Sequence, residues 1–466
     1  MTPSDILFAV LFAGFAVSFG WGIRGFVIGG EKGALLPGAL LGIAVAFFAM
    51  GEEGKNLWMY FAAVGALTTF YGGTETYAQT MSYLLSRDKE GPYYNQLKKG
   101  VTGIFLKGGL WFAIPGIVLS LLPSALTGAY KIWEIALLFA SFPFVSLIGT
   151  KIFNVPFDKK AGIRPRLYFS LDRREEWGSN VMIILVLTVF SLVKGDFYAL
   201  GAGLVGFIAG GLGFLIGLIM FDIERRHGEK IFGKRLHGAF IDGWKIMEHA
   251  FGAIAGGGLM LWFSLTSDHF TGIMKSVNIS SLTLGGDGLV CAVICLALMC
   301  LTAMQYPLTA YLEKKGKAID INVFEQIERP LWSAVPLIFI FLGSPSAAAF
   351  GTFGTLSFAL CEKCAVEWFE RSRYKKILRS SYAVMWVLLF VWFFLNIDSI
   401  SLTDTMLLYS LGYAGACGLY SFGPDNIRAL IKKENDIRHI FGSGLTVTTH
   451  ILLQGIILIY LSLIIN

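Results

Sequence analysis

The sequence predicts an all-α fold, a polytopic bundle of about 14 transmembrane helices with short interfacial or re-entrant helices on the cytoplasmic side. The chain of 466 residues is 55% hydrophobic and only 15% charged, whereas a soluble domain carries roughly 25% charged residues. Fourteen apolar segments, most of them near the length that crosses a bilayer, divide the chain. Basic residues are concentrated in alternate connections between these segments, which is typical of a multi-pass membrane protein.

The predicted spans run from the beginning of the chain to its end. They cover residues 6–23, 34–50, 57–71, 101–122, 132–152, 181–197, 200–221, 250–265, 289–311, 331–343, 347–360, 383–396, 406–419 and 445–465. The tenth and eleventh are short, so full crossing by these two stays open. We interpret residues 1–466 as one integral membrane domain. Helices 1–8, in residues 1–265, carry the polar motifs, and helices 9–14, in residues 266–466, form a mainly structural half.

The distribution of lysine and arginine predicts the topology. Of 38 such residues, 33 lie in the odd-numbered connections, 4 in the even-numbered ones, and Lys107 inside a span. Because basic side chains stay on the cytoplasmic side, both termini are expected on the non-cytoplasmic side of the plasma (inner) membrane. The net charge of +6 then faces anionic lipid. The expected partners are the bilayer and a small polar solute, and no nucleic acid, with the oligomeric state left open.

The first candidate motif lies at the end of the first span. Five glycines occur between positions 20 and 30, and glycine weakens a regular helix. Glycine-rich backbone exposes N–H groups, and Arg24 and Lys32 add positive charge beside Trp21, so this segment can bind an anion or a hydroxylated ligand. Glu31 is a counter-ion for either base. The alternative is a short cytoplasmic turn.

The second motif, residues 71–80, ends the third span with two glycines and begins a short helix. Glu75 and Gln79 are four residues apart and share a face of that helix. With Tyr71 and Tyr77 they form a polar set that can line a ligand cavity. The alternative is an interfacial helix with its polar face in water.

The third motif precedes the sixth span. Its carboxylates, among them Glu175, alternate with arginines within one turn, and Trp177 follows as an interfacial anchor. Such a cluster can shift a carboxylate pKa for acid–base chemistry. The alternative is an ion-paired, solvated helix start.

The fourth motif leads into the eighth span. Lys245, Glu248 and His249 are spaced at i, i+3 and i+4, so one helix face carries a base, an acid and a titratable imidazole. The glycine-rich stretch that follows predicts close packing against another helix.

Lys107 is a further candidate, because an ionisable residue inside a span is costly and marks function by default. It lies about two turns inside the fourth span, and its stem is expected to reach the cytoplasmic edge. No metal site and no cofactor are predicted, since the Cys-x-x-Cys of Cys361 and Cys364 lacks further ligands.

These motifs predict a membrane transporter of a small polar solute, anionic or sugar-like, with a cytoplasm-facing polar cavity. Proton coupling and sodium coupling are both compatible with the residues present. The alternative is a membrane-embedded enzyme, an intramembrane hydrolase or transferase for a glycosyl or lipid-linked substrate, whose catalytic carboxylates would be Glu31, Glu75, Glu175 and Glu248. A non-catalytic scaffold is the third interpretation. Whether the protein is an enzyme stays open at this stage.

Overall fold

The computed structural model describes residues 1–24, 30–74, 78–85, 96–157, 161–164, 167–169, 175–233, 243–278, 282, 311, 315, 321–354, 401–406 and 452–463. Only the backbone is described for residues 31, 74, 78, 79, 321–329 and 354. All regular elements in these ranges are helices. The predicted all-α class is therefore confirmed for the described part of the chain.

Six helices in the described ranges are long and apolar enough to cross a membrane, which supports a membrane-embedded protein. They are α1 (Pro3–Ile23), α7 (Leu97–Leu126), the run Ile132–Asn154 formed by α8 (Ile132–Ala140), α9 (Phe142–Gly149) and η3 (Thr150–Asn154), α10 (Trp177–Lys194), α11 (Phe197–Phe232) and α12 (Gly243–Leu265). Each matches a predicted span. A bundle of fourteen spans is not confirmed by these helices alone.

Two predicted spans form helices that are shorter than a bilayer crossing. α3 (Leu35–Ala49) has 15 residues and α5 (Trp58–Thr69) has 12. Gly51, at φ +70°, follows the end of α3, and a 3₁₀ turn continues α5. The remaining described elements are α2 (Gly30–Gly33), α4 (Gly51–Asn56), η2 (Phe70–Thr74), α6 (Ala78–Leu85), α13 (Ser267–Met274), α15 (Ile321–Phe341), α16 (Pro345–Ala349) and η5 (Phe350–Gly354).

The later predicted spans are only partly covered. α15 corresponds to the tenth, α16 with η5 to the start of the eleventh, and a helix at Leu452–Leu463 to the fourteenth. The ninth, twelfth and thirteenth predicted spans lie outside the described residues, apart from Tyr311 and Met406.

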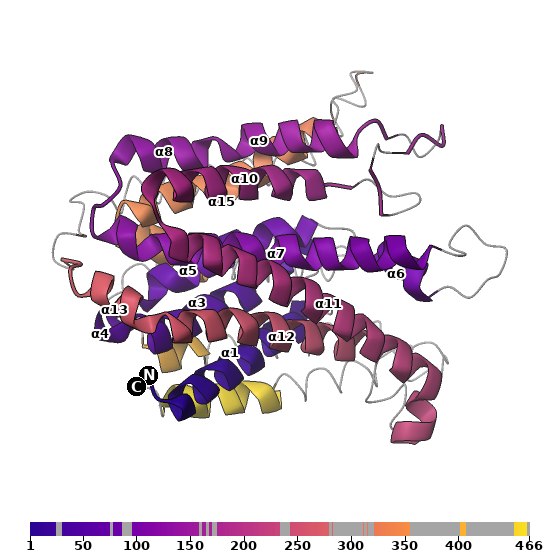
Figure 1. Ribbon diagram of the computed structural model, residues 1–466, viewed down its shortest axis with the longest axis horizontal. Helices are drawn as coiled ribbons and strands as arrows, with labels where there is room; N and C mark the ends of the chain where they lie inside the picture. Colours follow the sequence, from indigo (N-terminus) through magenta and orange to yellow (C-terminus); the bar gives the residue numbers. More distant parts are fainter. Residues whose placement is uncertain are drawn as a thin grey trace, which may run out of the picture.

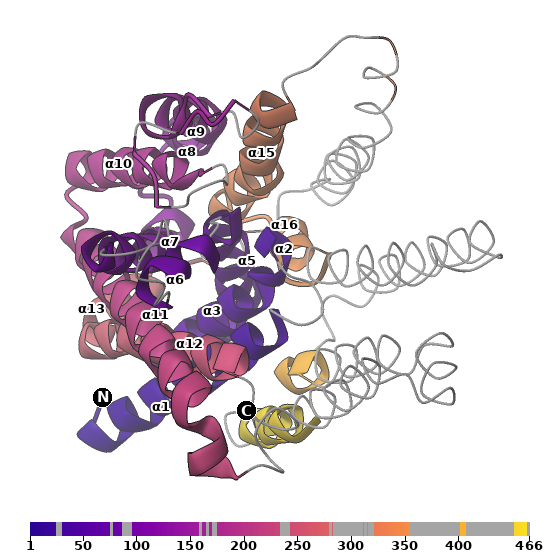
Figure 2. The ribbon, with the colours of Figure 1, turned by 90° about the vertical axis from the view of Figure 1, so that its right-hand side faces the viewer.

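The helices form two groups that lie one above the other in Figures 1 and 2. The central group contains α1, α3, α5, α7, α11 and α12, in which α11 packs along both α7 and α12, and α1 along α12. The second group contains α8, α9, α10 and α15. α10 packs against α7, and α15 against α5, so these two helices join the second group to the central one.

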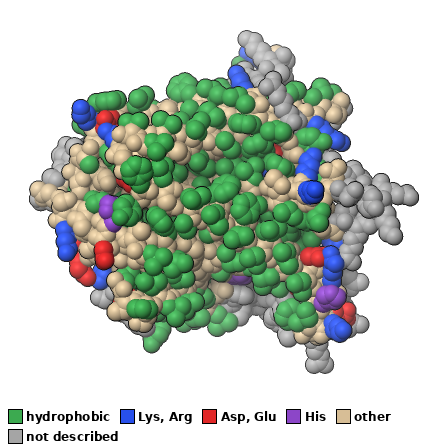
Figure 3. Space-filling model, viewed as in Figure 1, with side chains coloured by type: hydrophobic (Ala, Val, Ile, Leu, Met, Phe, Trp, Pro, Cys, Tyr) green, Lys and Arg blue, Asp and Glu red, His purple; other side chains and the backbone are tan. Residues whose placement is uncertain are grey.

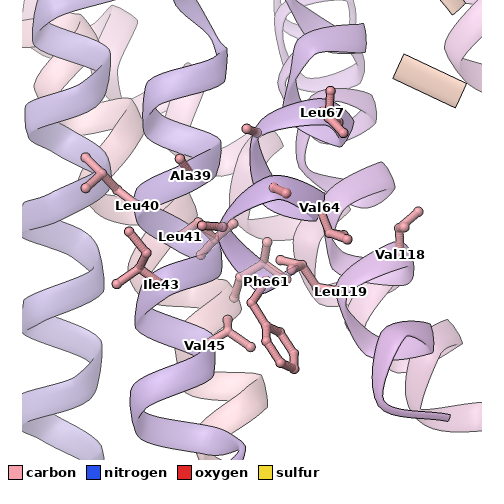
Figure 4. Close-up of a cluster of buried hydrophobic side chains, with 14 of the residues drawn as sticks. Ala39, Leu40, Leu41, Ile43, Val45, Phe61, Val64, Leu67, Val118 and Leu119 are labelled. Carbon is pink, nitrogen blue, oxygen red and sulfur yellow. The ribbon is translucent and has the colours of Figure 1, made fainter. Parts of the chain in front are cut away.

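Glycine governs how closely the central helices approach. Gly38 and Gly65 face each other where α3 crosses α5, and a Cβ on either one would overlap the other's backbone carbonyl. Around this crossing α3, α5 and α7 bury a cluster of hydrophobic side chains (Figure 4). Gly206 and Gly210 of α11 lie on the backbone of α7 in the same way. Gly206 and Gly210 are four residues apart, a spacing of small residues that lets two helix backbones approach closely.

The surface separates by polarity along the helix axes. In Figure 3 hydrophobic side chains cover the middle of the molecule, and charged side chains lie towards its two ends. At one end, which we call the Arg24 end, α1 and α11 finish and α7, α10 and α12 begin; Lys245 of α12 reaches the last turn of α1 there. At the opposite end, Lys194 Nζ contacts Glu134 Oε2 at 2.5 Å, and the Tyr130 hydroxyl donates to Asp196 at 3.2 Å.

His269 of α13, at this opposite end, is expected to make the stability of the protein depend on pH. Its ring stacks on Tyr198 with centroids 3.6 Å apart, and burial lowers its pKa while Asp196 opposes the shift. The unfolded chain therefore takes up the proton first, and stability is lost as pH falls through about 6.5, the unfolded value. Between about pH 7 and pH 5 we expect the melting temperature of His269→Phe to fall less than that of the wild type. Parallel curves would contradict this.

Candidate functional site

The site begins at the end of α1. α1 ends at Ile23, Arg24 keeps helical dihedral angles, and α2 starts at Gly30 with φ +55°; residues 25–29, the centre of the glycine-rich motif, lie outside the described residues. Arg24 Nε donates to the Gly30 carbonyl at 3.1 Å and joins the end of α1 to α2. α2 in turn packs against η2, the 3₁₀ end of the third predicted span. The first two sequence motifs thus meet in space.

Arg24 is a buried cation between indole rings. Its side chain is only 4% exposed, and its Cζ lies 4.9 Å from the ring centre of Trp21 and 4.6 Å from that of Trp111. The two indoles meet edge to face at 4.5 Å. Cation–π attraction is strongest for such desolvated cations. Gly72 of η2 lies against the Trp111 ring, where a Cβ would overlap the indole, so glycine at this position makes room for the ring.

The fourth motif lies against the same turn of α1. Lys245 Nζ donates to the Gly22 carbonyl and to Glu248 Oε2, each at 2.8 Å. His249 Nδ1 lies 2.9 Å from Ser18 Oγ. The other edge of the imidazole covers Gly22, where a Cβ would overlap it. Lys245, Glu248 and His249 therefore share one face of α12, as predicted, and this face packs against α1.

Lys107 and Glu175 form an ion pair inside the protein. Nζ and Oε1 are 3.6 Å apart, and both side chains are 0% exposed. Lys107 Nζ also donates to Thr80 Oγ1 at 3.1 Å. Glu175 accepts the Phe169 amide at 2.5 Å and Trp177 Nε1 at 2.7 Å. The expectation that Lys107 reaches the cytoplasmic edge is wrong, and so is a solvated role for Glu175, because the segment before α10 covers both.

Tyr71 connects the two helix groups through hydrogen bonds to α15 and α10. Its hydroxyl donates to the Pro330 carbonyl of α15 at 3.3 Å and accepts a hydrogen bond from Ser333. Its own carbonyl accepts Asn180 Nδ2 of α10 at 3.4 Å. α15 belongs to the half of the chain that the sequence suggests is structural, yet it contributes polar atoms at this point.

Most of the predicted site residues lie at the Arg24 end, and several others lie outside the residues that the structure describes. Those placed there are Trp21, Arg24, Tyr71, Lys107, Glu175, Trp177, Lys245, Glu248 and His249. Lys32 is half-buried in α2. Glu75 and Tyr77 lie outside the described residues, and for Glu31 and Gln79 only the backbone in α2 and α6 is described.

Sequence reasoning missed five contributors to these contacts: Ser18, Thr80, Trp111, Asn180 and Ser333. Trp111 carried a usable signal, because it follows Lys107 by four residues and shares its helix face. Asn180 closes the third motif. Thr80 closes the second motif. Ser18 and Ser333 carried no signal, since small hydroxyl residues are common in membrane helices.

Two of the predicted catalytic carboxylates, Glu175 and Glu248, each form an ion pair with a lysine. Glu175 is bound by Lys107, and Glu248 by Lys245. Among the residues that the structure describes, no group of three His, Cys, Asp or Glu side chains could hold a metal ion. Comparisons with protein-family models, curated proteins and solved structures found no match to this chain.

Proposed function

We propose that this protein is a multi-pass transporter of a small polar solute, anionic or sugar-like, in the plasma (inner) membrane. The observation that carries the proposal is the Lys107–Glu175 pair, which is 0% exposed and lies where α7 of the central group meets the segment that enters α10. Replacing such a pair by apolar side chains is often neutral or stabilising. Its presence in an apolar bundle therefore favours a role beyond stability.

The arrangement of helices supports transport over a scaffold role. Two helix groups meet along contacts that include buried polar atoms, among them Tyr71, Asn180 and Ser333. The third predicted span changes from the α-helix α5 to the 3₁₀ helix η2 near its end, and irregular helices are a recurrent feature of solute sites in transporters. The proposed topology has about 14 spans, with the Arg24 end in the cytoplasm and both termini on the other side.

A membrane-embedded enzyme receives less support from the contacts. Acid–base catalysis on a glycosyl bond needs two carboxylates facing one substrate. Glu175 and Glu248 are instead each held by a lysine. Glu248 beside His249 offers titratable groups for proton coupling, and sodium coupling is equally compatible with the proposal.

Uptake and counterflow in proteoliposomes test the proposal. Arg24→Ala, Glu75→Gln and Glu248→Gln are expected to reduce solute uptake at least tenfold while the purified yield stays at the wild-type level. Lys55→Gln is the matched control, because Lys55 lies at the opposite end and pairs with the exposed Glu52. Chemical conversion of a solute by protein in detergent, without uptake, would contradict the proposal and favour the enzyme.

A further inference from the structure

Two basic side chains flank one tyrosine ring at the Arg24 end. Lys99, in the first turn of α7, places its Nζ 3.3 Å from the ring centre of Tyr168. The Cζ of Arg164 lies 5.5 Å from the same ring centre, and Arg164 Nη1 donates to the Tyr168 hydroxyl at 3.2 Å. Tyr168, on the segment that connects η3 to α10, thus holds a cation of α7 and a cation of its own segment close together.

No carboxylate of the described residues pairs with these two cations. The hydrogen bond from Arg164 and the charge of Lys99 hold the pKa of the Tyr168 hydroxyl below its usual value, which is the effect expected of nearby positive charge. Arg164 is exposed and Lys99 half-buried, so a ligand in the surrounding phase can reach both. Since like charges at this spacing repel each other, an anion beside them is favourable.

Apolar side chains accompany the two cations at the surface. Leu97, Ile163 and Leu167 are 60%, 45% and 53% exposed, and each lies within three residues of Lys99 or Arg164 along the chain. Basic and tyrosine side chains among exposed apolar ones are typical of the boundary between a bilayer and water. Phospholipid head groups lie at this boundary, so they are the anions nearest to this surface.

A row of exposed apolar side chains begins beside this surface. The Leu167 amide donates to the Phe153 carbonyl of η3 at 3.1 Å, so the segment runs beside the end of η3. Phe144, Ile148 and Ile152 follow one another at four-residue spacing along α9 and η3, and all three are exposed. This spacing puts them near one face of the helix, along which an acyl chain can lie.

We propose that Lys99, Arg164 and Tyr168 bind the phosphate of an anionic phospholipid, one of whose acyl chains lies along the exposed row of α9 and η3. Arg164 supplies a planar, bidentate contact and Lys99 a point charge. The Tyr168 hydroxyl accepts from Arg164 and has its own hydrogen to donate. A choline head group would add a cation to this surface, so a lipid with net negative charge is preferred. The inference needs only that this end meets the membrane surface, and it is independent of the proposed transport.

Lipid binding to the purified full-length protein tests the inference. Delipidated protein in a non-ionic detergent is titrated with phosphatidylglycerol or with phosphatidylcholine of the same acyl chains, and native mass spectrometry counts the lipids bound. We expect phosphatidylglycerol to bind at least about fivefold more tightly, the effect of one basic side chain at an anionic membrane surface. Equal affinity for the two lipids would overturn the inference.

Single charge removals locate the bound lipid. Lys99→Gln and Arg164→Gln should each weaken the affinity for phosphatidylglycerol about fivefold and leave that for phosphatidylcholine unchanged. Lys230→Gln is the matched control, because Lys230 is an exposed lysine of α11 at the same end. An equal loss in this control would show a response to net charge and would contradict the assigned site. Should Lys99→Gln not fold, Arg164→Gln alone decides.

A soluble competitor separates a bound lipid from a bound free phosphate. Glycerol 3-phosphate carries the same phosphate group without acyl chains. We expect it to leave phosphatidylglycerol bound at equal concentration, because it cannot use the apolar row. Complete displacement would assign the surface to a soluble phosphate compound and overturn the lipid proposal. Solute uptake is measured separately, so failure of the transport proposal would leave these lipid affinities unchanged.

Discussion

Replacing Glu175 by glutamine is expected to destabilise the protein by about 3–5 kcal/mol, the typical cost of removing one partner of a buried ion pair. Lys107 would keep its charge at 0% exposure and lose the carboxylate of Glu175. Glutamine has nearly the shape of glutamate, so packing around Trp177 changes little. The loss of stability therefore measures the contribution of the carboxylate charge and its hydrogen bonds. The melting temperature in detergent, followed by intrinsic fluorescence, measures it.

A double-mutant cycle separates the pair from its surroundings. Lys107→Met alone leaves Glu175 buried with its Phe169 and Trp177 hydrogen bonds, so it should cost less than Glu175→Gln. The double variant, Lys107→Met with Glu175→Gln, should be more stable than Glu175→Gln alone, because it no longer buries the lysine charge. Glu52→Gln is the matched control: its pair with Lys55 is exposed, and such pairs contribute about 0–1 kcal/mol. Equal effects at Glu52 and Glu175 would refute the role assigned to the buried pair.

The sequence predicted where helices and polar residues occur better than which of them meet. Apolar segment length located α1, α7, α10, α11 and α12, because this signal is local. Charge alternation predicted that the beginning of α12 and the end of α1 share one face of the membrane, and Lys245 bound to the Gly22 carbonyl agrees with a shared end. The spacing of Lys245, Glu248 and His249 predicted a common helix face for the same local reason.

Partners between helices could not be predicted in this way. Lys107 and Glu175 are both recognisable as unusual residues, but periodicity says which face of a helix is polar and not which neighbour covers it. The prediction that Lys107 reaches the membrane edge failed because the segment carrying Phe169 and Glu175 folds over it. α3, which is buried along nearly its whole length, and α5 are also shorter than their predicted spans.

The crossing of α3 and α5 gives the second large expected effect. A Cβ at Gly65 would overlap the carbonyl of Gly38, a backbone atom that cannot rotate away. Gly65→Ala should therefore destabilise the protein by at least the roughly 1–3 kcal/mol typical of overpacking, because the helices must separate along the buried cluster of Figure 4. A lower folded yield and a lower melting temperature are the measurable results.

The same substitution at Gly272 is the matched control for Gly65→Ala. Gly272 lies in α13, and a Cβ there would meet nothing within 4 Å. Alanine favours a helix over glycine by about 0.8–1 kcal/mol, so Gly272→Ala should leave the melting temperature unchanged or raise it. Both variants replace glycine by alanine, and the higher helix propensity of alanine acts at both positions. Steric overlap occurs at Gly65 alone, so only Gly65→Ala is expected to lower the melting temperature. If Gly65→Ala raised the melting temperature as Gly272→Ala does, the two backbones could not be in contact at this crossing.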